Sequence, residues 1–237
     1  MKKIFLALMC TCFLASCSLF DAAKYSAEIS DGTDPSFDEY PGMNANTQPL
    51  EGEIFNWPET FMLNSVIVGE QNDSTQNEDA TVTDDMYGSG LCVIVTLDLT
   101  NTQNKKDTLR LPAGLLVQAT SATYQNGILV KRVNIPFKAN ERRVVSVRFY
   151  CLNVAAHASN SEAQFAPLSL ITNVPAFDPL FNVCAGKKLN INSYKGLNIL
   201  SYYGACVTVQ EIVWAITQGK TFKEKEIKKY LKHVKNS

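Results

Sequence analysis

Histidine is scarce in this chain, because His157 and His233 are the only two. No C-x-x-C pair and no closely spaced histidine pair follows the N-terminal apolar run, which argues against a zinc site. Neither a P-loop nor the glycine pattern of a dinucleotide-binding turn occurs. The sequence therefore predicts a protein with no metal and no cofactor.

The chain also lacks an excess of positive or negative charge, because its formal net charge is only −1. The charges are unevenly placed, with fifteen acidic residues between Ser18 and Asp85 and seven lysines from Lys220 to Ser237. No basic patch is interleaved with aromatic residues in the way that single-stranded nucleic acids require. We expect no nucleic-acid partner, an acidic solvated front and a basic surface helix at the end.

No apolar run is long enough to cross a bilayer as a helix, and the run Ile4–Leu14 after Lys2 and Lys3 has the length of a signal peptide. It ends in Leu-Ala-Ser-Cys17, which resembles a bacterial lipobox. That resemblance implies a signal peptide over 1–16, a lipid anchor on Cys17 and membrane attachment through it. Ser18 in place of aspartate favours the outer membrane or cell surface over inner-membrane retention. An ordinary secretory signal cut elsewhere is the alternative.

Two stretches are too polar to form a core. Residues 17–55 are rich in Asp, Ser, Gly, Pro and Asn and predict a flexible, lipid-anchored tether. The acidic stretch 71–85 lacks the ligand spacing of an EF-hand, so a solvated loop is favoured over a calcium site. One domain is then expected over 56–237.

The first half of that domain, 56–151, has the pattern of an antiparallel β-sandwich or barrel, so the fold class is mainly β with an α+β character. Short runs rich in β-branched residues alternate with turn residues, and Asn126-Gly127 is a hairpin signal. The expected strands are 60–68, 91–99, 128–137 and 142–151, and 108–112 with 114–118 is expected to form a strand pair or one bulged strand.

The second half, 152–237, is predicted to be mixed and then helical. Thr208-Val-Gln-Glu211 has the form of a capping box that starts a helix ending near Gly219. A second capping box at Thr221–Glu224 precedes apolar residues at helical spacing, namely Ile227, Tyr230, Leu231 and Val234.

Two short motifs carry the sharpest functional prediction. Tyr150-Cys151-Leu-Asn153 closes a strand, and Val209-Gln210-Glu-Ile-Val-Trp214 follows at a distance. Together they resemble the paired motifs of bacterial thioester domains, over roughly Leu91 to Lys220. The resemblance implies an internal thioester between Cys151 and Gln210, a supporting role for Tyr150 and Trp214, and covalent capture of amines on host proteins. Those domains occur mostly on Gram-positive surface proteins, so the lipoprotein signal departs from their usual anchoring.

Helix geometry supports the predicted thioester independently of the resemblance. If Thr208 caps the helix, Gln210 falls at about its second position, where free amides and a positive dipole would polarise its carbonyl and favour the Cys151 thiolate. Trp214 lies one turn further on the same face and would shield the bond from water.

Two alternatives remain open. After cleavage, four cysteines besides Cys17 are left, an even number that permits two disulfides in an exported protein (Cys92, Cys151, Cys184 and Cys206). Cys151, Asn153 and His157 also supply the residue types of a cysteine hydrolase, but their spacing matches no family signature. We therefore expect no enzyme.

The sequence thus predicts a cell-surface lipoprotein adhesin that captures an amine on an unknown surface or host protein through a Cys151–Gln210 thioester. The alternative is a disulfide-stabilised β-sandwich that binds its partner without a covalent bond.

Overall fold

The computed structural model of the chain describes residues 39–71, 81–154, 156–197 and 199–237. The predicted signal peptide 1–16, the lipid-carrying Cys17 and the tether up to residue 38 lie outside these ranges, as does most of the predicted acidic loop. The strands are β1 (Glu53–Ile54), β2 (Phe61–Leu63), β3 (Ile67–Gly69), β4 (Met86–Gly88), β5 (Val93–Asn101), β6 (Asp107–Leu111), β7 (Leu115–Val117), β8 (Gly127–Ile128), β9 (Val133–Phe137), β10 (Arg142–Cys151), β11 (Gln164–Phe165) and β12 (Leu170–Ile171). The helices are α3 (Asp178–Ala185), α4 (Leu200–Thr217) and α5 (Glu224–Tyr230), with short 3₁₀ turns at Pro175–Phe177, Ile191–Tyr194 and Leu231–His233.

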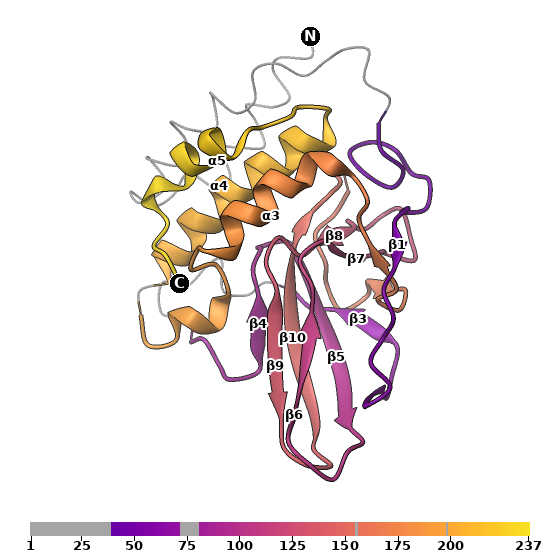
Figure 1. Ribbon diagram of the computed structural model, residues 1–237. Helices are drawn as coiled ribbons and strands as arrows, with labels where there is room; N and C mark the ends of the chain where they lie inside the picture. The colour runs from indigo at the N-terminus through magenta and orange to yellow at the C-terminus, as the bar shows by residue number, and fades with distance from the viewer. Residues whose placement is uncertain (1–38, 72–80, 155, 198) are drawn as a thin grey trace.

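The fold is mainly antiparallel β with its helices in the C-terminal part, which confirms the predicted fold class. One sheet runs in the order β1-β12-β7-β8-β10-β5-β3-β11, with β2 added to β5 and β4 added in parallel to β10. Strands β6 and β9 pair in antiparallel orientation and form a separate two-stranded sheet. Figure 1 shows the long strands extending away from α3, α4 and α5, which lie together over one end of the sheet.

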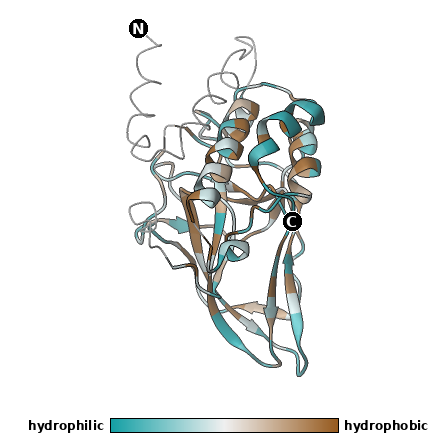
Figure 2. Cartoon of the chain, turned by 90° about the vertical axis from the view of Figure 1, so that its left-hand side faces the viewer, coloured by the Kyte–Doolittle hydropathy of each residue, from teal (hydrophilic) through white to brown (hydrophobic). Residues whose placement is uncertain are grey.

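Strand β10 connects the two halves of the molecule. It pairs with β5 from Arg142 to Phe149 and then with β8 at Tyr150 and Cys151. Because side chains alternate along a strand, successive residues face different cores. Phe149 and Cys151 belong to a core between the sheets, here called the sheet core, whereas Tyr150 and Leu152 belong to a core under the helices, the helix core. Figure 2 shows hydrophobic residues where helices and strands meet and hydrophilic residues at the far ends of the strands.

The predicted strands at 91–99 and 142–151 are confirmed. The stretches 108–112 and 114–118 form β6 and β7, but these strands lie in different sheets, so the expected strand pair or bulged strand is wrong. Two longer predicted strands are interrupted. The stretch 60–68 forms β2 and β3 because Asn64 leaves the strand path and its side chain donates to Asp98 Oδ1 (2.9 Å) and Thr100 Oγ1 (3.0 Å). The stretch 128–137 contributes to β8 in the large sheet and forms β9 in the two-stranded sheet, so the chain changes sheets between them.

The Asn126-Gly127 pair does not form the predicted hairpin turn. Gly127 begins β8, and Asn126 instead uses its side chain, accepting from the Ala119 amide and donating to the Gly42 carbonyl (2.8 and 2.9 Å). A Cβ on Gly127 would lie 2.7 Å from Phe149 Cβ, so the glycine is needed for close packing rather than for a turn.

The described part of the predicted tether, 39–55, is packed against the domain. Met43 is 1% exposed and Leu50 5% exposed, both in the helix core. The Asn44 amide donates to the Leu152 carbonyl (2.8 Å), and Asn153 Nδ2 donates to the Gly42 carbonyl (2.9 Å). The prediction that the tether continues to residue 55 is therefore wrong for these residues, because two apolar side chains and several backbone bonds suffice to hold a polar segment.

Both predicted helix starts are wrong, although the helices exist. Helix α4 begins at Leu200, and Thr208 lies inside it with its hydroxyl donating to the Gly204 carbonyl (3.1 Å). Helix α5 begins after Lys223, whose amide donates to Glu226 Oε2 (2.7 Å). A Thr-x-x-Glu pattern thus did not mark either N-terminus. The apolar face predicted for α5 is buried, at Ile227, Leu231 and Val234.

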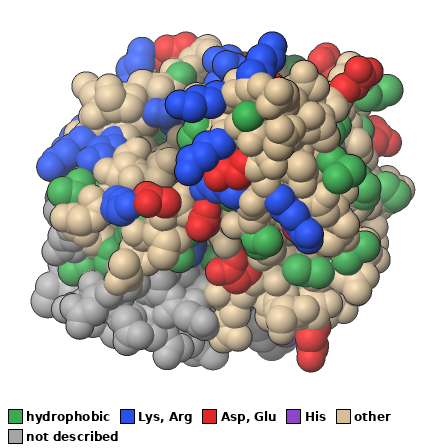
Figure 3. Space-filling model, turned by 90° about the horizontal axis from the view of Figure 1, so that it is seen from below, with side chains coloured by type: hydrophobic (Ala, Val, Ile, Leu, Met, Phe, Trp, Pro, Cys, Tyr) green, Lys and Arg blue, Asp and Glu red, His purple; other side chains and the backbone are tan. Residues whose placement is uncertain are grey.

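The surface at the strand ends holds acidic side chains close to basic ones (Figure 3). Arg142 forms a two-bond ion pair with Asp98 (2.6 and 2.9 Å), and Asn64 also donates to that carboxylate. These hydrogen bonds, from Arg142 first and Asn64 second, lower the pKa of Asp98 from 3.8 to about 2.

We predict that this ion pair steepens acid unfolding. The folded-state pKa of Asp98 is below its ordinary value, so its contribution is complete above about pH 4 and is lost as the pH falls toward 2. Asp98→Asn should therefore show a shallower loss of stability between about pH 4 and pH 2, measured by urea unfolding at each pH. Equal slopes for the two proteins would contradict the prediction.

Candidate functional site: Cys151 and Gln210

Cys151 ends β10 at a point where one edge of the strand has lost its neighbour. The Ser146 amide donates to Asp85 and the Leu152 amide donates to Asn126, so even-numbered residues of β10 direct their backbone groups toward the β4 and β8 side. The odd-numbered Cys151 therefore directs its N–H and C=O toward the β5 side. Pairing with β5 stops at Phe149 and Val93, which leaves the Cys151 backbone groups in need of another partner.

Gln210 of α4 supplies that partner. The Cys151 amide donates to Gln210 Oε1 (2.9 Å), and Gln210 Nε2 donates to the Cys151 carbonyl (2.8 Å). The carboxamide thus replaces a neighbouring strand with two hydrogen bonds to one residue. Cys151 is fully buried and Gln210 is 8% exposed, so this arrangement is shielded from bulk water. The structure brings together the two residues that the sequence paired, across 59 positions of the chain.

The helix-start argument for Gln210 is wrong. Gln210 lies in the interior of α4, far from Leu200, so neither free first-turn amides nor the positive end of the helix dipole act on its carbonyl. The group that does polarise the carbonyl is the Cys151 amide itself. This contact depends on how β10 ends, which a local helix pattern does not reveal.

Tyr150 and Trp214 occupy different positions around the pair. Tyr150 points into the helix core, where its hydroxyl donates to Cys206 Sγ at 3.7 Å and burial raises its pKa well above 10. It supports the strand from the opposite face instead of lining the thiol. Trp214, one turn after Gln210, is half-buried and packs against the sheet core to which Cys151 belongs. Of the two, Trp214 is placed to shield the pair.

Cys92 is the residue that sequence reasoning did not single out. Its thiol lies against that of Cys151, and each affects the pKa of the other. The interaction with the Cys151 side chain lowers the pKa of Cys92, while burial raises the pKa of Cys151 well above 9. The four cysteines of the described ranges are free thiols in the structure, and Cys92 is the one in contact with Cys151.

The other two residues of the hydrolase hypothesis, Asn153 and His157, make contacts elsewhere. The Asn153 side chain accepts from the Asn126 amide and donates to Gly42. His157 is exposed in a loop, and its backbone bonds Thr123 and Gln125. Asn153 thus anchors the N-terminal segment beside Cys151.

The comparisons with known proteins gave no match, whether to family models, curated proteins or solved structures. Within the described ranges, no cluster of three or more His, Cys, Asp or Glu side chains could hold a metal ion. Over those same ranges, no helix has the length and apolar character needed to cross a membrane.

Proposed function

We propose that the chain is a surface lipoprotein adhesin whose Cys151 and Gln210 form an internal thioester that captures amines covalently. The observation that carries the proposal is the pair of hydrogen bonds between the Gln210 carboxamide and the Cys151 backbone. They hold the acyl carbon beside the residue that carries the thiol, which is the proximity that such a condensation needs.

The bond would form by addition and elimination. The Cys151 sulfur attacks Cδ of Gln210, the carbonyl electrons move to Oε1, and the Cys151 amide stabilises the resulting oxyanion. The Sγ–Cδ bond forms, the Cδ–Nε2 bond breaks, and the thiol proton leaves with the nitrogen as ammonia.

Capture would run the same chemistry with a different nucleophile. A partner amine attacks Cδ of Gln210, the C–S bond breaks, and the Cys151 sulfur leaves and takes up the proton released by the amine. The product is an amide between Gln210 and the partner, with Cys151 returned to a thiol. Burial of both residues protects the thioester from hydrolysis, so the amine must enter through a local opening of the fold.

The competing proposal is a disulfide-held domain that binds its partner without a covalent bond. The observation in its favour is the contact between Cys92 and Cys151, which oxidation would turn into a disulfide in an exported protein. A Cys92–Cys151 disulfide and a Cys151–Gln210 thioester exclude each other, because both use the same sulfur.

Intact mass of the purified full chain, before and after methylamine, tests the proposal. We expect a mass short by one ammonia, then addition of methylamine at Gln210 with release of an alkylatable Cys151. Cys92→Ala is the matched control, because it removes the neighbouring thiol and should leave the ammonia loss in place. A mass short by two hydrogens, unchanged by methylamine and restored by reductant, would overturn the thioester and favour the disulfide.

A further inference from the structure

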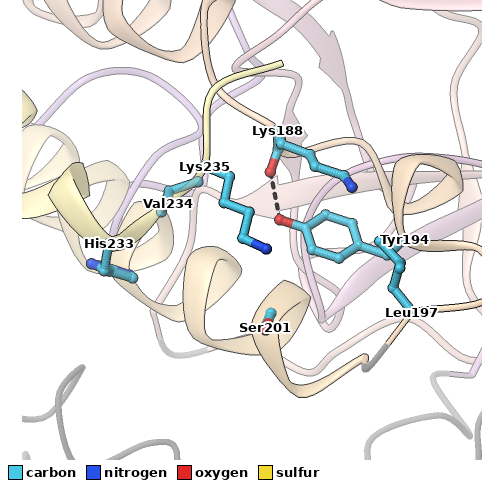
Figure 4. A pocket seen from close by; sticks show the side chains of 7 residues that line it. All are labelled: Lys188, Tyr194, Leu197, Ser201, His233, Val234 and Lys235. Atoms are coloured by element: carbon cyan, nitrogen blue, oxygen red, sulfur yellow. Dashed lines mark hydrogen bonds between the residues drawn. The ribbon is translucent and has the colours of Figure 1, made fainter.

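A pocket of about 200 Å³ lies at the N-terminal end of α4, away from Gln210, and is not used by the proposed thioester. Three separate segments form it: the loop after α3, the turn leading into α4, and the C-terminal residues after α5. Figure 4 shows its lining side chains, which are Lys188, Tyr194, Leu197, Ser201, His233, Val234 and Lys235. At a rise of about 1.5 Å per residue, Ser201 and Gln210 are about 13 Å apart along the helix.

The lining is cationic. Lys188 and Lys235 contribute two ammonium groups, His233 contributes an imidazole, and no carboxylate side chain lines the pocket. The Lys188 ammonium lies 5.0 Å from the centroid of the Tyr194 ring, a cation–π contact that fixes its direction. In Figure 4 the Lys188 and Lys235 side chains both extend toward Tyr194, and Ser201 lies beside the end of Lys235. Two positive groups and a hydroxyl donor therefore lie around Tyr194 in the lining of one small pocket.

Hydrogen bonds between the three segments hold the pocket in shape. The Lys188 amide donates to the Lys235 carbonyl (2.8 Å), and the Tyr194 hydroxyl donates to the Lys188 carbonyl (2.6 Å). Lys187 Nζ donates to the Val234 carbonyl (2.9 Å), which ties the C-terminal segment to the loop after α3. A site that is already formed loses less conformational entropy on binding than a flexible one.

We propose that this pocket binds a small phosphate monoester. Two ammonium groups match the double negative charge of a phosphate monoester, and lysine binds phosphate well as a point charge. Ser201 can donate a further hydrogen bond to a phosphate oxygen. Tyr194, Leu197 and Val234 form an apolar wall that fits the organic part of the ester better than a bare ion. The proposal is independent of the chemistry at Cys151.

Isothermal titration of the purified full chain with phenyl phosphate tests the site, with inorganic phosphate and neutral phenol as comparison ligands. We expect saturable binding of phenyl phosphate, weaker binding of inorganic phosphate and none of phenol. The double variant Lys188→Ala/Lys235→Ala should weaken phenyl phosphate binding by at least about tenfold, because it removes both cations. Lys225→Ala removes an exposed charge of α5 that does not line the pocket, and should change binding by less than about twofold.

Thermal unfolding by circular dichroism identifies variants that have lost the fold, and Lys188→Arg/Lys235→Arg, which keeps both charges, should retain most of the binding. Absence of saturable phenyl phosphate binding, equal binding of phenol, or equal weakening by Lys225→Ala would overturn the proposal.

Co-sedimentation with phosphatidic acid vesicles, compared with phosphatidylcholine vesicles, distinguishes the two sources of a phosphate monoester, a lipid headgroup and a soluble ester. Sedimentation that the Lys188/Lys235 double variant abolishes identifies a lipid headgroup, and titration without sedimentation identifies a soluble ester.

Discussion

Gln210→Ala is expected to abolish amine capture and also to leave the domain about 2–4 kcal/mol less stable than Cys151→Ala, although neither variant can form a thioester. The difference arises because Gln210 bonds the backbone of residue 151 and not its side chain. Cys151→Ala keeps both hydrogen bonds. Gln210→Ala leaves a buried N–H and a buried C=O without partners, and each such group costs about 1–3 kcal/mol. Urea unfolding of the two variants, with intact mass on the same samples, measures both effects.

The comparison also separates the two proposed functions. If a Cys92–Cys151 disulfide holds the domain, Cys151→Ala and Cys92→Ala should lose similar stability, about 2–4 kcal/mol, and Gln210→Ala should keep the two-hydrogen mass loss. If the thioester forms, Cys92→Ala should keep the ammonia loss and Cys151→Ala should not. Equal stability of Gln210→Ala and Cys151→Ala would show that the backbone bonds to Gln210 are not needed by the fold.

Gly90→Ala is expected to be the most disruptive single methyl addition near the site. Gly90 has φ +126°, which L side chains rarely adopt, and an added Cβ would lie 2.0 Å from the Phe149 carbonyl oxygen. The Gly90 carbonyl also accepts the hydroxyl of Tyr202 from α4 (3.0 Å), so a shift here moves β10 and α4 relative to each other. We expect a loss of roughly 3 kcal/mol or more in the free energy of unfolding, with amine capture reduced as well.

Gly204→Ala provides the matched control. Gly204 lies inside α4, where an added Cβ would have no neighbouring atom within 4 Å. Alanine in a helix interior is favoured over glycine by about 1 kcal/mol, so this variant should be as stable as the original chain or slightly more so. Urea unfolding followed by tryptophan fluorescence compares the two substitutions. A free energy of unfolding for Gly90→Ala within about 0.5 kcal/mol of the original chain would show that the segment between β4 and β5 adapts without strain.

The sequence paired Cys151 with Gln210, and the structure places them in contact, but the geometry of that contact was not predicted. The alternating residues of β10 placed Cys151 at a strand end, and that prediction is confirmed. The position of Gln210 in its helix was wrong, because Thr208 bonds back to Gly204 inside α4 where a cap was expected. The neighbour Cys92 could not be predicted, since its approach depends on where the β5–β10 ladder stops.

The same limit applies to the rest of the fold. Periodicity identified β5 and β10 because a buried strand shows its pattern locally. The break between β2 and β3 depends on Asn64 bonding Asp98 and Thr100, which are distant in sequence. Likewise, the composition of 39–55 is that of a loose segment, but Met43 and Leu50 find buried sites that only the assembled helix core provides.

The packing of that N-terminal segment has a mechanical consequence. A pull applied to the chain upstream of Glu39 would reach the domain first through the bonds of Gly42 and Asn44 to Asn153 and Leu152. Leu152 and Asn153 directly follow Cys151 in the sequence. Tension on the segment would therefore be borne next to the thiol, and peeling it away would loosen the end of β10 before the long β5–β10 ladder is loaded.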